Sequence, residues 1–266
     1  MKHYGLIGFP LSHSFSKKYF TEKFEKEGVT DHQYDLFELQ NLSDFPDLLR
    51  AQADLCGLNV TVPHKIGVLH YMDWLSEEAK AIGAVNCIRI TAESPLEAAF
   101  SGEVGIKGHN FRLEGFNTDV YGFEHSLKPH LTHHHKKALL LGDGGAARAV
   151  KYVLDKLEIE YQVVTRRPAP GNILFSDLTT EMMDEYLVVI NTTPVGTYPK
   201  VDECPPIPYE FITDRHLLYD LIYNPEETLF LQKGKEKGAT IKNGFEMLVL
   251  QAERSWQIWQ SHKVNL

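Results

Sequence analysis

A glycine-rich turn between an apolar strand and a helix constrains the fold of this 266-residue chain more than any other feature. Residues 138–141 form a short apolar run that predicts a buried strand, and the apolar spacing that continues to Leu157 predicts a helix. Between them stands the pattern Gly142-x-Gly144-x-x-Ala147. Strand, turn and helix in this order are the context in which such a pattern binds a dinucleotide.

The residue types in this turn suit a pyrophosphate. Gly142 allows a tight turn, Gly144 lets the backbone approach the phosphates, and Ala147 still permits close packing of helix on strand. The helix N-terminus adds free N–H groups and a partial positive charge. Asp143 would repel an anionic ligand unless its carboxylate points away or caps an N–H group. The alternative interpretation is a plain glycine-rich turn that binds nothing.

The next expected strand, residues 161–164, indicates which dinucleotide fits. An NAD site expects an acidic residue about 20 residues beyond the turn, to bind the ribose 2′-hydroxyl. Here the strand is followed by Thr165-Arg166-Arg167, without an acid. Arginine forks match a phosphate in shape and charge, so the sequence favours the 2′-phosphate of NADP. Two ordinary surface arginines are the alternative.

Alternating strands and helices extend through the rest of the chain. Apolar runs at 187–191 and 217–221 lie among helix-like stretches, which predicts βαβ units and a parallel sheet. Residues 93–114 are expected to form a hairpin or an excursion. Residues 128–137 are expected to be a solvated linker, with a metal site as the alternative, because they include His130, His133, His134 and His135.

Composition excludes several classes of protein. The 27 basic and 36 acidic residues give a net charge of -9, which argues against nucleic-acid binding. The longest apolar runs fall far short of the roughly 18 residues that a membrane span needs. Three cysteines without a close pair fit a reducing compartment, and the N-terminal residues predict no signal peptide. We therefore expect a soluble, cytoplasmic α/β protein.

Four polar clusters lie at expected strand ends or loops of the first half. They offer hydroxyls, amides, one ammonium and one carboxylate. This set can hold a small polyol carboxylate by neutral hydrogen bonds and supply one proton-transfer group. Each cluster alone is equally compatible with helix caps and turns. The clusters are residues 12–16, 59–65, 83–86 and 115–119.

Together with motifs of the second half, these clusters make the sequence similar to the shikimate dehydrogenase family. The motifs follow the family's order from Tyr4 to about Gln260, nearly the whole chain. They are Ser14-x-Ser16, 59–65, 83–86, Asn117-Thr118-Asp119, 142–148, 191–196, 220–223 and Asn243-Gly244 with Gln251. The resemblance implies an oxidoreductase that reduces 3-dehydroshikimate to shikimate with NADPH, reversibly, in chorismate and aromatic amino-acid biosynthesis.

The resemblance also implies a role for each matching residue, and it implies no metal. Lys65 would be the catalytic acid/base, with Asp119 beside it. Substrate contacts would fall on Ser14, Ser16, Asn59, Thr61, Asn86, Tyr223 and Gln251. Cofactor contacts would fall on Gly142, Asp143, Gly144, Gly145, Ala146, Thr165, Arg166, Arg167, Leu221 and Gly244.

The chain departs from the family pattern at four of its motif positions. Asp143 replaces a small residue in the phosphate loop, and Glu246 stands where a glycine is usual. Thr165 and Arg167 stand where Asn and Thr are common. None of these departures touches Lys65 or Asp119.

The fold implied is α/β, with two domains. An N-terminal α/β substrate-binding domain would comprise residues 1–119, completed by 243–266 through a last helix that returns to it. A Rossmann-like NADP-binding domain would comprise residues 120–242. The protein would be a monomer or homodimer. The alternatives are a quinate/shikimate dehydrogenase with relaxed substrate or NAD use, and a catalytically silent nucleotide-binding paralogue.

Overall fold

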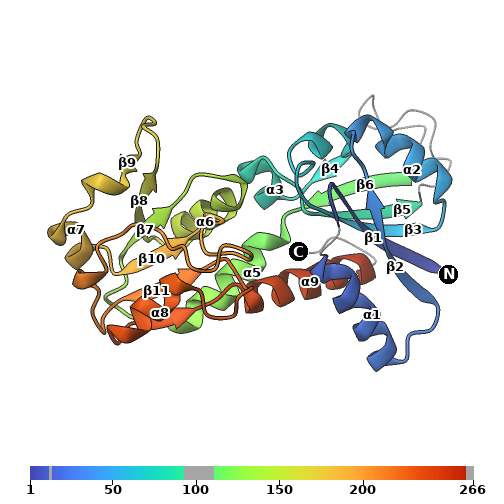
Figure 1. Cartoon of the computed structure of the whole chain (residues 1–266). Helices are drawn as coiled ribbons and strands as arrows, with labels where there is room; N and C mark the ends of the chain where they lie inside the picture. Colours follow the sequence, from blue (N-terminus) through green and yellow to red (C-terminus); the bar gives the residue numbers. More distant parts are fainter. Residues whose placement is uncertain (12–13, 93–110, 262–266) are drawn as a thin grey trace. The chain divides into compact units, whose positions relative to one another are not determined.

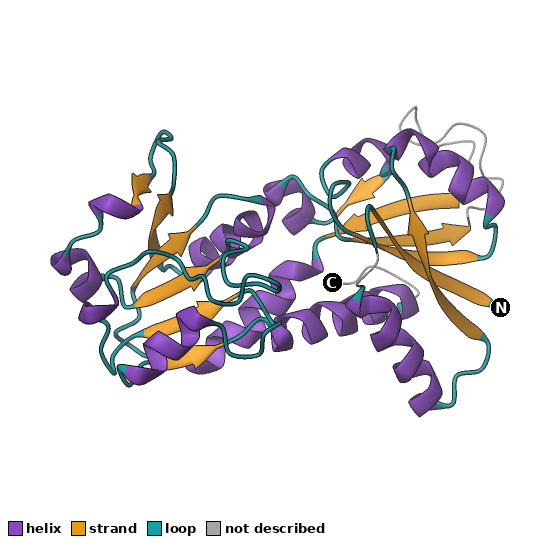
Figure 2. Cartoon of the chain, viewed as in Figure 1, coloured by secondary structure: helices purple, strands orange, loops and turns teal. Residues whose placement is uncertain are grey.

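A computed structural model describes residues 1–11, 14–92 and 111–261 of the chain, which divides into two compact units. Unit 1 comprises Met1–Thr118 and Ala252–Leu266, and unit 2 comprises Asp119–Gln251. Each unit combines helices with one sheet, which confirms the predicted α/β class (Figures 1 and 2). The chain leaves unit 1 at the start of α5 (Thr118–Leu127) and returns within α9 (Phe245–Gln260).

Unit 1 is built on a mixed six-stranded sheet with the order β2-β1-β3-β5-β6-β4. Strand β1 pairs in parallel with β2 and β3, whereas β5 runs antiparallel to both β3 and β6. The strands are β1 (Lys2–Gly8), β2 (His32–Glu38), β3 (Leu55–Val60), β4 (Trp74–Leu75), β5 (Cys87–Ala92) and β6 (Phe111–Phe116). Of the predicted excursion at 93–114, residues 111–114 begin β6 and the others lie outside the described residues.

The helices of unit 1 begin and end where local signals place them. Helix α1 (Phe15–Glu27) ends at Gly28, whose φ of 65° provides the left-handed cap. Helix α3 (Glu77–Ile82) begins after Ser76, whose hydroxyl accepts a hydrogen bond from the Ala79 N–H. The remaining helices are α2 (Phe45–Ala51) and the short turns η1 (Leu42–Asp44) and η2 (Gly67–Tyr71).

The last turns of α9 complete the core of unit 1. The Trp259 ring stacks on Tyr4 of β1, with ring centroids 5.0 Å apart, and its indole N–H donates to the Ile88 carbonyl at 2.9 Å. Nearer the middle of the helix, Glu253 accepts from Lys23 of α1 at 2.9 Å. The returning helix therefore packs on both the sheet and α1 of this unit.

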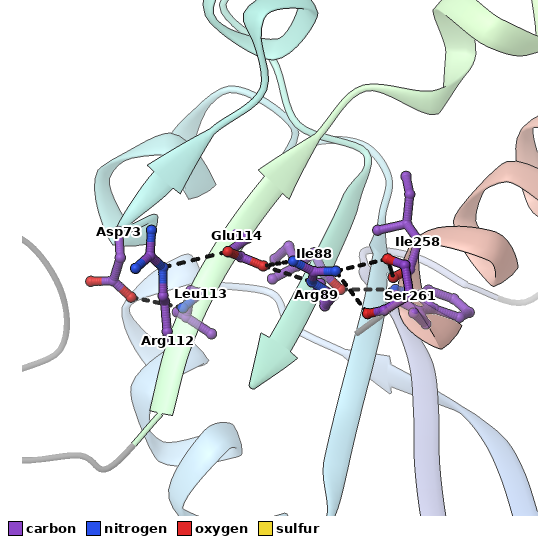
Figure 3. Close-up of polar contacts among 9 residues, drawn as sticks. Asp73, Ile88, Arg89, Arg112, Leu113, Glu114, Ile258 and Ser261 are labelled. Carbon is purple, nitrogen blue, oxygen red and sulfur yellow. Dashed lines mark hydrogen bonds and ion pairs between the residues drawn. The ribbon is translucent and has the colours of Figure 1, made fainter. Parts of the chain in front are cut away.

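A buried arginine pairs with a glutamate within the sheet and also bonds to the residue that follows α9 (Figure 3). Arg89 of β5 donates to Glu114 of β6 at 2.6 Å, and both residues are buried. The Arg89 guanidinium also donates to the Ser261 carbonyl at 2.9 Å and to the Ser261 hydroxyl at 2.8 Å. A buried charge needs such partners, because removing one leaves the other uncompensated. Ser261 is thus held to the sheet by Arg89.

Unit 2 is built on a fully parallel six-stranded sheet with the order β12-β11-β10-β7-β8-β9. Counted within the unit, this is the Rossmann order 3-2-1-4-5-6 read from its other edge. In such sheets ligands bind beyond the carboxyl ends of the strands, where the strand order reverses, here between β7 and β10. The strands are β7 (Lys137–Leu141), β8 (Glu160–Thr165), β9 (Ile173–Leu174), β10 (Val188–Asn191), β11 (Leu217–Asp220) and β12 (Thr240–Lys242).

The central strands of unit 2 are apolar along their length because helices and loops cover both faces of a parallel sheet. Leu139, Leu140, Val188 and Val189 are fully buried. The helices of the unit are α5, η3 (Lys128–His130), α6 (Gly145–Lys156), η4 (Phe175–Asp177), α7 (Thr180–Glu185), η5 (Tyr209–Phe211), α8 (Leu229–Glu236) and the first turns of α9.

The histidine-rich segment is only partly the solvated linker that the sequence predicts. His135 is buried: its Nε2 bonds to the Arg215 carbonyl at 3.0 Å, and its Nδ1 accepts from the Thr132 N–H at 3.0 Å. Burial lowers the pKa of His135. The expectation was wrong at this position because the stabilising partner lies 80 residues away in sequence. Among the described residues no group of three or more His, Cys, Asp or Glu side chains could hold a metal ion.

Candidate active site

A cavity of about 870 Å³ opens in unit 2 at the carboxyl ends of β7, β8 and β10. It lies where the strand order reverses, the position at which parallel sheets bind their ligands. The structure brings six of the predicted cofactor residues to its wall, namely Gly142, Asp143 and Gly144 after β7, and Thr165, Arg166 and Arg167 from the end of β8.

The glycine turn leaves open space where a phosphate group fits. Gly142 has a φ of 100°, and a Cβ there would lie 2.7 Å from the Thr193 Cγ2 atom, so this position requires glycine. A Cβ on Gly144 or Gly145 would instead meet no heavy atom within 4 Å. The exposed N–H groups at the start of α6 face an anion favourably. The turn therefore fits the pyrophosphate of NADP.

The Asp143 carboxylate is engaged by two side chains. Its Oδ1 atom forms an ion pair with Lys151 of α6, and its Oδ2 atom accepts from the Asn172 amide at 3.2 Å. The Lys151 hydrogen bond holds the pKa of Asp143 below its usual range, so the carboxyl group is ionised. Lys151 offsets the negative charge that Asp143 brings to the phosphate loop.

A buried carboxyl group fixes the loops that follow β10 and β11. The Oδ1 atom of Asp220 accepts from the Asn191 amide and from the Ile222 N–H, each at 3.0 Å. The Oδ2 atom accepts from the Thr228 hydroxyl at 2.6 Å. Asn191 in turn accepts from the Thr193 hydroxyl at 2.7 Å, and Thr193 lines the cavity. Sequence analysis gave Asp220 no role, although an acid that ends an apolar strand is the signal that could have found it.

The Asp220→Asn variant is expected to lose a pH dependence of stability. Burial raises the pKa of Asp220 from 3.8 to about 6. The folded state therefore binds this proton more tightly than the unfolded chain does. Protonated Asp220 contributes fully to the free energy of unfolding below about pH 4, and this contribution is lost as the pH rises to about 6. The loss amounts to about 3 kcal/mol at 1.36 kcal/mol per pKa unit.

Urea unfolding of both proteins between about pH 4 and pH 8 measures this effect. The free energy of unfolding of the variant, relative to the wild type, should rise across the interval and level off above about pH 6. A relative free energy that stays constant over the whole interval contradicts the assignment.

In unit 1, Ser14 presents a buried hydroxyl that has no hydrogen-bond partner among the described residues. It precedes α1 but forms no side-chain cap bond with that helix. Buried polar groups are nearly always paired, so this hydroxyl fits a ligand that would pair with it in the predicted site. Two residues further on, Ser16 hydrogen-bonds Tyr34, and burial raises the pKa of this tyrosine well above its usual value.

Three polar residues of the first half, Asn59, Asn86 and Thr118, belong to one buried hydrogen-bond network. Tyr34 donates to the Asn59 carbonyl oxygen at 2.8 Å, and the Asn59 amide donates to Ser255 of α9 at 2.9 Å. Ser255 and Thr118 lie 3.2 Å apart through their hydroxyls, and the Thr118 N–H donates to Asn86 at 2.7 Å. Both ends of the Asn59 side-chain amide are therefore engaged within the protein, and its substrate contact stays a prediction.

The backbone around Lys65 is held on both sides. The His64 N–H donates to the Thr61 carbonyl at 2.9 Å, and the His64 ring bonds to the Leu39 carbonyl at 2.6 Å. The Lys65 carbonyl accepts from the Val85 N–H at 2.8 Å. The turn after β3 therefore presents a half-buried Lys65 from a fixed backbone.

The remaining predicted residues belong to unit 2. Asp119 follows Thr118 in the first turn of α5. Tyr223 is exposed, and Gln251 is buried with its amide donating to the Leu248 carbonyl at 2.9 Å. The Gly244 N–H donates to the Ile222 carbonyl at 3.1 Å, beside Leu221, which donates to the Asn191 carbonyl at 3.0 Å.

Comparison with known proteins identifies the family. Residues 6–88 match the model of the shikimate dehydrogenase substrate binding domain. A shikimate dehydrogenase (NADP(+)) of Clostridium beijerinckii is 38% identical over 276 residues, which cover 100% of this chain and 94% of that relative. The chain belongs to the shikimate dehydrogenase family. This confirms the resemblance predicted from the motifs.

Other shikimate dehydrogenases agree over the same length. The shikimate dehydrogenase (NADP(+)) of Methanococcus maripaludis strain C6 is 34% identical, covering 98% of this chain and 92% of that relative. The crystal structure from Thermus thermophilus in complex with NADP(H) and shikimate has a TM-score of 0.78 at 29% identity, covering 98% of this chain and 94% of that one. The structure from Listeria monocytogenes in complex with shikimate and NAD has a TM-score of 0.81 at 25% identity, covering 99% and 92%.

Proposed function

We propose that this protein is a shikimate dehydrogenase that reduces 3-dehydroshikimate to shikimate with NADPH, reversibly, in chorismate and aromatic amino-acid biosynthesis. The cavity of unit 2 carries the proposal, because an open glycine turn and two arginines line one wall of the space that a dinucleotide with a 2′-phosphate needs. Full-length relatives named shikimate dehydrogenase (NADP(+)) support the same reaction.

Unit 2 is the proposed NADP-binding domain. The residues from Gly142 to Ala146 would hold the pyrophosphate, and Thr165, Arg166 and Arg167 would hold the 2′-phosphate. Leu221 and Gly244 would complete the cofactor contacts. When bound, NADPH supplies the hydride for the reduction.

Unit 1 is the proposed substrate-binding domain, in line with the family model that matches residues 6–88. The unpaired Ser14 hydroxyl, with Ser16, would receive the substrate carboxylate, and Thr61 and Asn86 would bind its other polar groups. The proposed substrate contacts of Asp119, Tyr223 and Gln251 rest on the motif match.

Lys65 is the proposed proton donor. During reduction, negative charge grows on the ketone oxygen, and a positioned ammonium both stabilises that charge and donates the proton. Asp119 would anchor a substrate hydroxyl and orient the ammonium. In the oxidative direction the same side chain would accept the proton that the substrate hydroxyl releases.

The decisive experiment compares NADPH and NADH with 3-dehydroshikimate and 3-dehydroquinate, following the loss of reduced-cofactor absorbance. We expect the fastest oxidation with NADPH and 3-dehydroshikimate. A faster rate with NADH or with 3-dehydroquinate would support the quinate/shikimate alternative, and the NAD-bound relative makes the NADH arm necessary. NADPH binding without oxidation by either acid would indicate a silent paralogue.

The remaining parts of the proposal concern assembly and location. We expect a monomer or homodimer in the cytoplasm. The three cysteines form no disulfide, which fits a reducing compartment. Within the parts of the chain that the structure describes, no helix is long and apolar enough to cross a membrane.

A further inference from the structure

The loop that carries Arg166 and Arg167 is exposed and lies between β8 and the two-residue strand β9. Its own bonds are few: the Thr165 hydroxyl donates to the Arg167 carbonyl at 2.8 Å, and the Asn172 N–H donates to the Ala169 carbonyl at 3.1 Å. An exposed loop with few contacts loses conformational freedom when it binds a ligand. Whatever holds this loop before binding therefore reduces the cost of binding a 2′-phosphate.

Asp143 connects this loop to the glycine turn. Its Oδ2 atom accepts from the Asn172 amide at 3.2 Å, at the end of the arginine loop. Its Oδ1 atom is paired with Lys151, which fixes the carboxylate to the outer part of α6. One side chain thus joins the pyrophosphate turn, the helix behind it and the arginine loop, and all of these residues except Lys151 line or border the same cavity.

We propose that Asp143 and Asn172 form a strut that sets the spacing between the pyrophosphate and 2′-phosphate subsites, and thereby determines the preference for NADPH over NADH. The inference rests on the proposed NADP-dependent function. The pyrophosphate and the 2′-phosphate of NADP are attached to the same ribose, so the distance between their two subsites must match that fixed spacing. Asp143 is a positioning residue, because its carboxylate acts through Asn172 and not on the phosphate.

The positioning role of Asp143 can be separated from the effect of its charge on phosphate ligands in general. Removing Asp143 takes one negative charge from the phosphate loop and releases the Lys151 ammonium, which favours every phosphate ligand. The strut concerns the 2′-phosphate alone. The quantity to measure is therefore the ratio of affinities for ligands with and without that phosphate.

The test uses calorimetric binding of two fragments without a nicotinamide, adenosine 2′,5′-bisphosphate and adenosine 5′-monophosphate. The wild type should prefer the bisphosphate. We expect Asn172→Ala to lower that preference about fivefold. This decrease is somewhat smaller than the one expected when a charge-assisted hydrogen bond to the 2′-phosphate itself is removed. Asn172→Asp, which opposes two carboxylates, should lower it further. Arg166→Ala gives the reference for direct loss of a phosphate contact.

A reciprocal exchange and a matched control make the test decisive. The double variant Asp143→Asn with Asn172→Asp restores a carboxylate–amide pair and should recover most of the preference lost in Asn172→Asp alone. Gln162→Ala removes another bond to the same loop, from the Gln162 amide to the Gly171 carbonyl at 2.9 Å, without touching the glycine turn. We expect this control to retain the wild-type preference.

Four outcomes overturn the inference. Unchanged preference in Asn172→Ala, or an equal loss in Gln162→Ala, shows that the link to Asp143 does not set the preference, and the NADP proposal stands. Failure of the reciprocal exchange in a protein that melts at the wild-type temperature leads to the same conclusion. A wild type that binds both fragments equally overturns the NADP proposal together with the strut.

Discussion

Replacement of Lys65 by alanine is expected to lower turnover by about 10²- to 10⁴-fold, the usual contribution of a general acid. The ammonium is presented from a backbone that the His64 ring and the Val85 N–H hold in place, so its removal deletes the proton donor without loosening the turn. NADPH affinity should stay nearly constant, because the proposed cofactor cavity is lined by unit 2 alone.

Steady-state rates with 3-dehydroshikimate and fluorescence titration with NADPH separate these two effects. Lys65→Met serves as a control that keeps the length of the side chain and removes its charge, and it should behave like Lys65→Ala. A decrease of less than tenfold in turnover would exclude Lys65 as the proton donor.

Valine at position 144 is expected to weaken NADPH binding by about 100-fold, or about 2.7 kcal/mol. A Cβ at Gly144 would meet no heavy atom within 4 Å, so the added side chain should occupy the open space in which we propose the pyrophosphate binds. The loss should therefore arise from exclusion of the ligand and not from damage to the fold. Fluorescence titration gives the affinity, and thermal unfolding should give a melting temperature close to that of the wild type.

Two further substitutions in the same turn calibrate this result. Gly144→Ala adds a single methyl group and should weaken binding less than valine does. Gly142→Ala is different, because φ is 100° there and the added Cβ would lie 2.7 Å from the Thr193 Cγ2 atom, so it should lower the melting temperature. Normal NADPH binding by a folded Gly144→Val protein would place the pyrophosphate elsewhere.

Features with local causes could be predicted from the sequence. The strand expected at 138–141 is β7, because an apolar run depends on a few neighbouring residues. Features with distant causes could not. His135 is buried through a carbonyl 80 residues away, and the Asn59 amide bonds to a hydroxyl 196 residues away.

The candidate site divides in the same way. Periodicity and motif spacing predicted that the glycine turn and the arginines follow successive strands, and parallel pairing of β7 with β8 brings them to one cavity. From the sequence, the Asp143 carboxylate could either point away from the ligand or cap an N–H group. In the structure it is engaged by the side chains of Lys151 and Asn172. The buried Asp220 accepts from Ile222 and Thr228, 2 and 8 residues further along the chain, but its bond from Asn191 spans 29 residues and depends on the pairing of β10 with β11.

The packing of Trp259 on Tyr4 has a consequence for how the polypeptide matures on the ribosome. Unit 2 is continuous in sequence, so every residue it needs has been synthesised before the final turns of α9 emerge. Tyr4 belongs to β1, yet the Trp259 ring that covers it is synthesised only after the whole of unit 2. Strand β1 therefore reaches its native packing only after all of unit 2 has left the ribosome.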